Sequence, residues 1–148
     1  MAGNLFLDIL STPSSLNLYT QLRSDAGNAF ETEADWADPA ALKKMRLTDS
    51  VIRESIRFSS IQIRGLLRAV VAEDGVTLPN GTHVARGTWL GVPVEAVHMD
   101  ERFYDKPLEY DPFRFVRIRS GGLESQEKVD ATEITDRFLG WSYGRYAW

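Results

Sequence analysis

Three charged side chains have the types and spacing to join distant parts of this chain. Glu54 and Arg57 lie three residues apart in the segment RESIR, so on a helix they share a face and can pair. Taken alone, such a pair is more often a solvated surface salt bridge. Arg114 follows much later, between aromatic residues in YDPFRFVR, and could reach back to Glu54. A carboxylate shared by two guanidinium groups is a strong and geometrically specific joint.

The same residues carry a resemblance to a known family. The segment ESIR at 54–57 resembles the ExxR motif of the K helix in cytochromes P450, and PFRF at 112–115 resembles the later proline-x-Arg-Phe motif of that family. The resemblance implies that Glu54, Arg57 and Arg114 form the family's structural triad, which supports the heme-binding core without doing chemistry. The stretch at 36–45, leading into the ExxR segment, is most similar to fungal microsomal members.

The final residues, FLGWSYGRYAW, resemble the family's heme-binding loop, which reads approximately Phe-Gly-x-Gly-Arg-x-x-Cys-x-Gly. By this resemblance Arg145 pairs with a heme propionate, and Arg68, in GLLRAVV, resembles a second propionate-binding arginine. Trp148 stands at the position of the cysteine that binds the heme iron. Without the resemblance, Arg145 is a loop surface charge and Arg68 an exposed strand residue.

The resemblance also implies a function. It indicates a heme-dependent monooxygenase, in fungal secondary metabolism, that oxidises an apolar small molecule with electrons from NADPH delivered by a cytochrome P450 reductase. Residues 59–67 are similar to a segment that contacts substrate, so Ile61, Ile63 and Leu66 are candidates for that contact. The same three side chains could equally be core residues. Intact microsomal members lie at the endoplasmic reticulum membrane, and no anchor is expected in this chain.

The chain contains no cysteine, and this changes the expected chemistry. Disulfides, zinc–cysteine sites, iron–sulfur clusters and thiolate ligands are therefore excluded within these 148 residues. The indole nitrogen of Trp148 is a donor and offers no lone pair to a metal. We expect a truncated chain without monooxygenase activity, either an incomplete gene product or a catalytically dead relative. The alternative is a non-catalytic interaction or structural module derived from the same core.

Two histidines remain, and they do not form a metal site. His83 follows a predicted hairpin turn and is expected to be exposed. His98 resembles a position near the heme edge in some family members, although a surface or packing role is the more common explanation. They are far apart in the sequence, and no carboxylate is spaced as a further ligand.

Composition excludes several other classes of protein. The chain is 43% hydrophobic and 26% charged, which is typical of a globular domain and too apolar for a disordered one. The net charge is −4 with both signs interspersed, so no basic surface for nucleic acid is expected. No apolar run approaches the roughly 20 residues that a membrane-spanning helix needs.

The elements that must position these residues begin as helices. Apolar spacing predicts a short helix at 5–10 and a second one after Pro13, with Leu16, Tyr19 and Leu22 buried. Asp38 and Pro39 predict a short helix to about residue 44.

Thr48 is predicted to cap the strongest helix, at about 48–58, which carries the ExxR segment with Ile52 and Ile56 on one face. A β pattern then covers about 64–92, with a tight hairpin turn at Asn80-Gly81. One or two helical turns are expected at 93–99.

Residues 100–115 are expected to form an ordered coil, and 117–137 a surface loop. The predicted class is α+β, a partial cytochrome P450 fold of helices, a small antiparallel sheet and a long coil meander. We expect one partial domain over 1–148, with the meander and an incomplete heme-binding loop at about 100–148.

Overall fold

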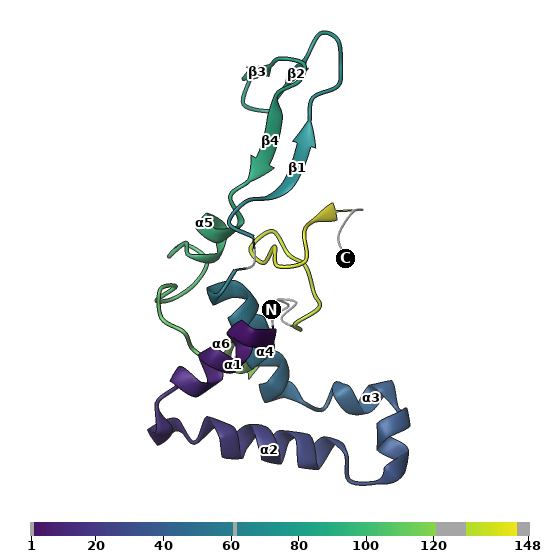
Figure 1. Ribbon diagram of the computed structural model, residues 1–148, viewed down its shortest axis with the longest axis vertical. Coiled ribbons are helices and arrows are strands. Elements are labelled where there is room, and N and C mark those ends of the chain that lie inside the picture. Colours follow the sequence, from purple (N-terminus) through teal and green to yellow (C-terminus); the bar gives the residue numbers. More distant parts are fainter. Residues whose placement is uncertain (1, 61, 121–129, 145–148) are drawn as a thin grey trace.

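The structure of the protein is a computed structural model that describes residues 2–60, 62–120 and 130–144. Helices make up one end of the molecule, and a narrow β ribbon projects from the other end (Figure 1). The first part of the chain forms four α-helices and two short 3-10 helices: α1 Ala2–Ser11, η1 Ser14–Leu16, α2 Leu18–Ala29, η2 Glu33–Ala37, α3 Pro39–Leu42 and α4 Arg46–Phe58.

The β ribbon confirms the predicted antiparallel pairing. Strand β1 (Gly65–Ala69) pairs with β4 (Trp89–Val92), and the short β2 (Val76–Thr77) pairs with β3 (His83–Val84) across the turn at Asn80-Gly81. The register of β1 against β4 shifts between Gly65 and Arg68, where Leu66 adopts a positive φ of 56°. Together with the helices, this small antiparallel ribbon confirms the α+β class predicted from the sequence.

The meander after the ribbon is shorter than predicted. Helix α5 (Val94–His98) is followed by coil, but a further helix, α6, spans Arg114–Ser120 where coil and loop were expected. Its first turn needs partners for free backbone amides. The Ser50 hydroxyl, from α4, accepts from the amides of Phe115 and Val116, both at 3.2 Å. Because this partner comes from a distant helix, the local sequence gave no sign of it.

Helix α4 begins at Arg46, so the prediction that Thr48 caps it was wrong. The amide and the hydroxyl of Thr48 instead both donate to the Asp25 carboxylate of α2, each at 2.8 Å. Asp25 thus satisfies an amide of the first turn, and its negative charge lies where the helix dipole favours it. A side chain from a neighbouring helix replaces the local cap.

The predicted buried stripe on the second helix was also wrong. Leu16 and Tyr19 are exposed, and Leu22 is half-buried, whereas Leu18 and Ala29 are the buried residues of α2. The cause is Asn17, whose φ of 49° is left-handed and separates η1 from α2. The helical phase therefore restarts at Leu18, and Leu16 does not share a face with the later residues.

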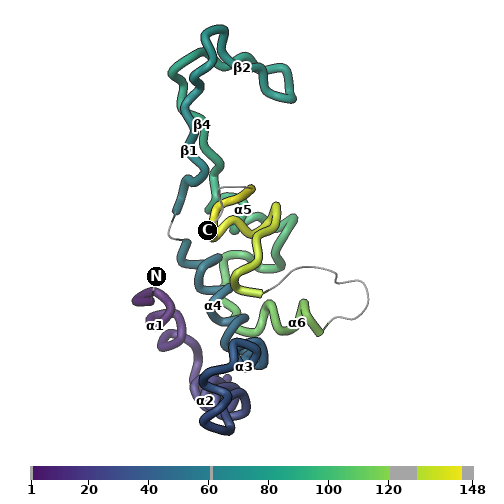
Figure 2. The backbone as a smooth tube through the Cα atoms, turned by 90° about the vertical axis from the view of Figure 1, so that its right-hand side faces the viewer, coloured from purple at the N-terminus to yellow at the C-terminus, as the bar shows by residue number. Residues whose placement is uncertain are grey.

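Helix α4 lies at the centre of the helical part, in contact with α1, α2, α5 and α6. Figure 2 shows it between α1 and the C-terminal segment. Seven of its thirteen residues are buried, and these include the charged residues Arg53, Glu54 and Arg57. Within the described part of the chain, no helix is long and apolar enough to cross a membrane.

Candidate functional site: three faces of helix α4

The first face of α4 carries Glu54, which is fully buried and holds two arginines. Arg57 donates to both carboxylate oxygens of Glu54, from Nε and Nη2, at 2.8 Å each. Arg114, at the start of α6, donates from Nε to the same two oxygens at 3.2 and 3.1 Å. The amide of Asp111 adds a further bond to Oε1 at 3.0 Å. We call Glu54, Arg57 and Arg114 the Glu54 joint.

The two arginines of the Glu54 joint also bind the main chain of the meander. Arg57 Nη1 donates to the carbonyls of His98 and Pro107, each at 2.8 Å. Arg114 donates to the carbonyls of Asp105, Lys106 and Glu109. A coil without regular structure needs such partners for its carbonyls when it is covered by protein. The Glu54 joint therefore fixes the coil after α5 against α4.

The second face of α4 holds the segment 130–139. Asp49 accepts from the amide of Ala131 at 2.9 Å. One turn later, Arg53 donates from Nη1 to the carbonyls of Asp130 and Glu133. The guanidinium carbon of Arg53 also lies 3.9 Å from the ring centroid of Phe138. A desolvated contact of this kind contributes on the order of 2 kcal/mol.

His98, the last residue of α5, contacts the same segment through Leu139 and Phe138. It is fully buried, and its Nε2 accepts from the amide of Leu139 at 2.9 Å. Its ring stacks on Phe138, with centroids 5.3 Å apart. Burial first, and then the cations of Arg57 and Arg53, together lower the pKa of His98 from its ordinary value of 6.5 to about 4. The imidazole is therefore neutral at pH 7.

The third face of α4 packs against α1. The Asp8 carboxylate accepts from the hydroxyl of Ser55, in α4, and from that of Ser59, which directly follows the last residue of α4. Beside this contact lies a cavity of about 370 Å³. Its lining is mainly apolar: Ala2, Asn4, Leu5, Ile52, Ser55, Ile56 and Ser59. The prediction that Ile52 and Ile56 share a face is confirmed by this shared lining.

Tyr110 lies between the first and third faces. Its ring packs edge-on against Phe58, with centroids 5.8 Å apart. Burial raises the pKa of the Tyr110 phenol above its ordinary range, and the carboxylates of Asp8 and Glu54 raise it further. The phenol is therefore a neutral group and adds no charge to the Glu54 joint.

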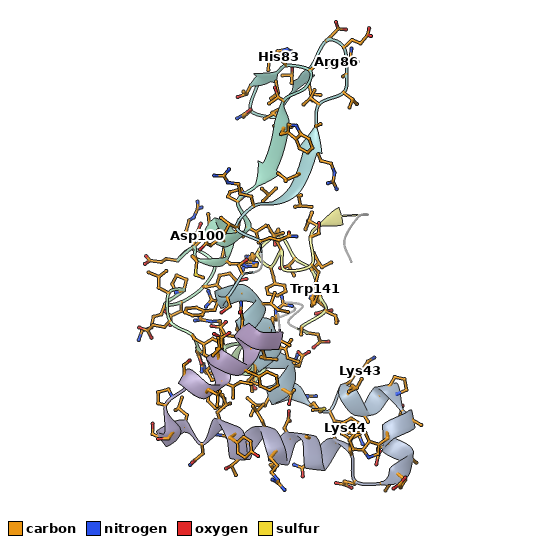
Figure 3. The ribbon with its side chains drawn as sticks, viewed as in Figure 1. Lys43, Lys44, His83, Arg86, Asp100 and Trp141 are labelled. Carbon is orange, nitrogen blue, oxygen red and sulfur yellow. The ribbon has the colours of Figure 1, made fainter. Side chains whose placement is uncertain are left out.

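The other residues predicted from the sequence do not gather at α4. Arg68 is exposed on β1, where its Nη1 donates to the carbonyl of Leu67 at 2.8 Å. Ile63 is 65% exposed, and Leu66 is half-buried at the base of the ribbon. His83 is exposed, as predicted, and lies at the far end of the ribbon (Figure 3). Three predicted positions lie outside the described residues: Ile61, Arg145 and Trp148.

The residues of this chain supply no axial ligand of the family type for a heme. The axial thiolate is missing because the sequence has no cysteine. The buried cations Arg53, Arg57 and Arg114 are engaged by protein groups. Of the two arginines predicted to bind the heme propionates, the structure describes only Arg68, which is exposed on strand β1. In the described part of the chain, the buried charged residues therefore serve chiefly to hold neighbouring segments against α4.

Sequence reasoning missed Arg53, whereas the packing role that it offered for His98 is the one that the structure supports. The only available sign of Arg53 was its helical spacing from Asp49, which places both on one side of α4. The two alternatives for His98 were a place near the heme edge and a surface or packing role. Full burial excludes the surface, and the ring packs on Phe138. Because Phe138 lies far away in the sequence, no local pattern could pair it with either residue.

Comparison with known proteins identifies relatives of this chain. A family model described as cytochrome P450 matches residues 18–145. The chain is 45% identical to the cytochrome P450 monooxygenase polB of Polytolypa hystricis, over 97% of this chain and 29% of that protein. It is 44% identical to the cytochrome P450 monooxygenase efuH of Hormonema carpetanum, over 99% of this chain and 27% of that protein.

Solved structures give the same fold. A zebrafish cytochrome P450, described with progesterone, aligns with a TM-score of 0.65 and 18% identity over 97% of this chain and 29% of that one. The chain thus spans less than a third of the length of the relatives that it matches.

Proposed function

The chain belongs to the cytochrome P450 family, and from this premise we propose that it is part of a fungal heme monooxygenase. The whole protein oxidises an apolar small molecule of secondary metabolism, with electrons from NADPH supplied through a reductase. The observation that carries the proposal is the 45% identity to a fungal monooxygenase over 97% of the chain. A second fungal monooxygenase, at 44% identity over 99% of the chain, supports it.

In this proposal the Glu54 joint is structural and touches no substrate. Support comes from the burial of Glu54, whose side chain is 0% exposed, and from its four guanidinium bonds and one amide bond. A carboxylate so completely occupied cannot also reach a reacting molecule. It holds the meander and α6 against α4 and so fixes their positions relative to that helix.

Heme and substrate contacts are assigned to the remaining predicted residues. Arg68 and Arg145 bind the heme propionates, and Ile61, Ile63 and Leu66 contact the apolar substrate. The exposure of Arg68 and Ile63 supports these roles, because both side chains are accessible to a ligand. A heme bound through a cysteine thiolate supplies the oxygen activation of this family. These 148 residues cannot provide that thiolate, so the chain of this length alone is inactive.

Spectroscopy and turnover test the proposal with two proteins. The first is the product of the complete transcript that contains this reading frame, and the second is the 148-residue chain. With heme, reductase and NADPH, the first is expected to show the carbon monoxide difference spectrum of a thiolate-bound heme and to oxidise apolar substrates. The second is expected to show neither. Turnover by the 148-residue chain contradicts its inactivity, and a complete product without the thiolate spectrum contradicts the monooxygenase.

A further inference from the structure

Phe138 and its neighbours are held by two side chains that lie outside the Glu54 joint. The Phe138 ring is fully buried, and it contacts both the guanidinium of Arg53 and the imidazole of His98. Arg53 also binds the carbonyls of Asp130 and Glu133, and His98 binds the amide of Leu139. Three main-chain groups and one ring of residues 130–139 are thus fixed by Arg53 and His98.

The bond between His98 and Leu139 requires one protonation state. Because Nε2 accepts the amide of Leu139, the proton of the neutral ring is on Nδ1. Protonation of Nε2 would place a donor against a donor and abolish this bond. The charged groups that face the ring are Arg53 and Arg57 from α4, the latter paired with Glu54. The C-terminal segment faces it with the uncharged Phe138 and Leu139.

We propose that Arg53 and His98 form a clamp that positions residues 130–139, separately from the Glu54 joint, and so sets where residues 140–144 leave α4. Both are positioning residues and contact no reacting atom. For its catalytic meaning the inference rests on the proposed function, because residues 140–144 belong to the segment that resembles the heme-binding loop. The clamp itself is a property of the chain without heme.

The clamp and the Glu54 joint hold different stretches of chain. The arginines of the joint bind carbonyls between His98 and Glu109, whereas the clamp binds groups between Asp130 and Leu139. Gly140 extends the clamped path along α4, since a Cβ there would overlap the Ile56 side chain. Loss of the clamp should therefore release 130–142 while the meander stays bound.

Hydrogen–deuterium exchange of the 148-residue chain tests the clamp without heme or substrate. The variant His98→Phe keeps an aromatic ring but has no acceptor for the amide of Leu139. We expect exchange in peptides covering 136–142 to rise about tenfold or more at pH 7, while peptides from 46–58 remain protected. In His98→Gln, the side-chain amide oxygen can replace Nε2 as acceptor, and protection should remain.

Acid supplies a second measurement that needs no disruptive variant. Between pH 7 and pH 4, after correction for intrinsic exchange, the unsubstituted chain should lose protection in 136–142, and His98→Gln should not. Arg53→Met should raise exchange across 130–139, whereas Arg86→Met, on the exposed tip of the ribbon (Figure 3), should leave it unchanged.

Three results would overturn the clamp. One is unchanged exchange at 136–142 in His98→Phe, and another is an effect of His98→Gln as large as that of His98→Phe. The third is an equal acid response in His98→Gln and the unsubstituted chain, which decides the matter even if His98→Phe unfolds completely. Since no heme is present, failure of the proposed monooxygenase function leaves these outcomes unaffected.

Discussion

Arg57 donates to the main-chain carbonyl of His98 at 2.8 Å, while the ring of the same histidine accepts from Leu139. His98 is thus the residue through which the Glu54 joint meets the C-terminal segment. The arrangement also concentrates positive charge, because Arg53, Arg57 and Arg114 are all buried and Glu54 is the carboxylate between two of them. Burial is the main reason why His98 is neutral, and the nearby cations Arg57 and Arg53 act in the same direction, since a further positive charge there would be disfavoured.

Loss of the Glu54 charge should be far more costly than loss of an exposed one. In Glu54→Gln, two buried guanidinium groups lose their counter-charge, so we expect the free energy of unfolding to fall by about 3–5 kcal/mol. The control is Glu73→Gln, on the ribbon, whose side chain is 88% exposed and whose ion pair should contribute under about 0.5 kcal/mol. Urea denaturation measures both, and equal midpoints would contradict a stabilising joint.

The pKa of His98 predicts that acid destabilises the fold. Its folded pKa is about 4 against an ordinary 6.5, so the unfolded chain binds more protons between these values. The stabilisation is complete above pH 6.5 and is lost as the pH falls toward 4, to a total on the order of 3 kcal/mol. Unfolding free energies of the chain and of His98→Gln at several pH values isolate this contribution. Parallel curves would show that the neutral histidine adds nothing.

Most elements of the fold could be predicted from the sequence because their signals are local. The Asn80-Gly81 turn and the Asp38-Pro39 helix start each depend on a few neighbouring residues, and the structure contains both. In the second, the Asp38 side chain accepts from the amide of Ala40 at 2.8 Å. Where a distant partner decides, prediction failed: Asp25 caps α4, and Ser50 caps α6.

The same distinction between local signals and distant partners applies to the candidate site. The contact of Glu54 with Arg57 follows from helical spacing, whereas the place of Arg114 was expected only from its aromatic surroundings and the resemblance. Arg53 and His98 lacked such a guide, because their partners at 130–139 lie beyond a polar loop in the sequence. The residue type alone also does not show whether a histidine is buried, and it is the tertiary packing that makes His98 buried and leaves His83 exposed.

Gly140 is predicted to tolerate no side chain. A Cβ there would overlap Cγ2 of the buried Ile56 and lie 3.1 Å from Phe138, so Gly140→Ala should destabilise the chain by about 1–3 kcal/mol. Gly27, inside α2, has open space around the same position, and Gly27→Ala should stabilise by about 0.5–1 kcal/mol. Thermal unfolding should shift in opposite directions, and a shift of the same sign would contradict the close packing of 140 on α4.

Arg114 and Arg117 offer a matched pair for the geometry of the Glu54 joint. Both lie in α6 and pair with a carboxylate, but Arg114 is 6% exposed on Glu54 whereas Arg117 is 60% exposed on Asp111. Lysine keeps the charge but lacks the planar fork that serves Glu54 and three carbonyls together. We therefore expect Arg114→Lys to cost about 2–3 kcal/mol and Arg117→Lys under about 0.5 kcal/mol in urea denaturation. If the two variants unfold alike, charge alone suffices at Glu54, and the fork geometry is not what holds the meander.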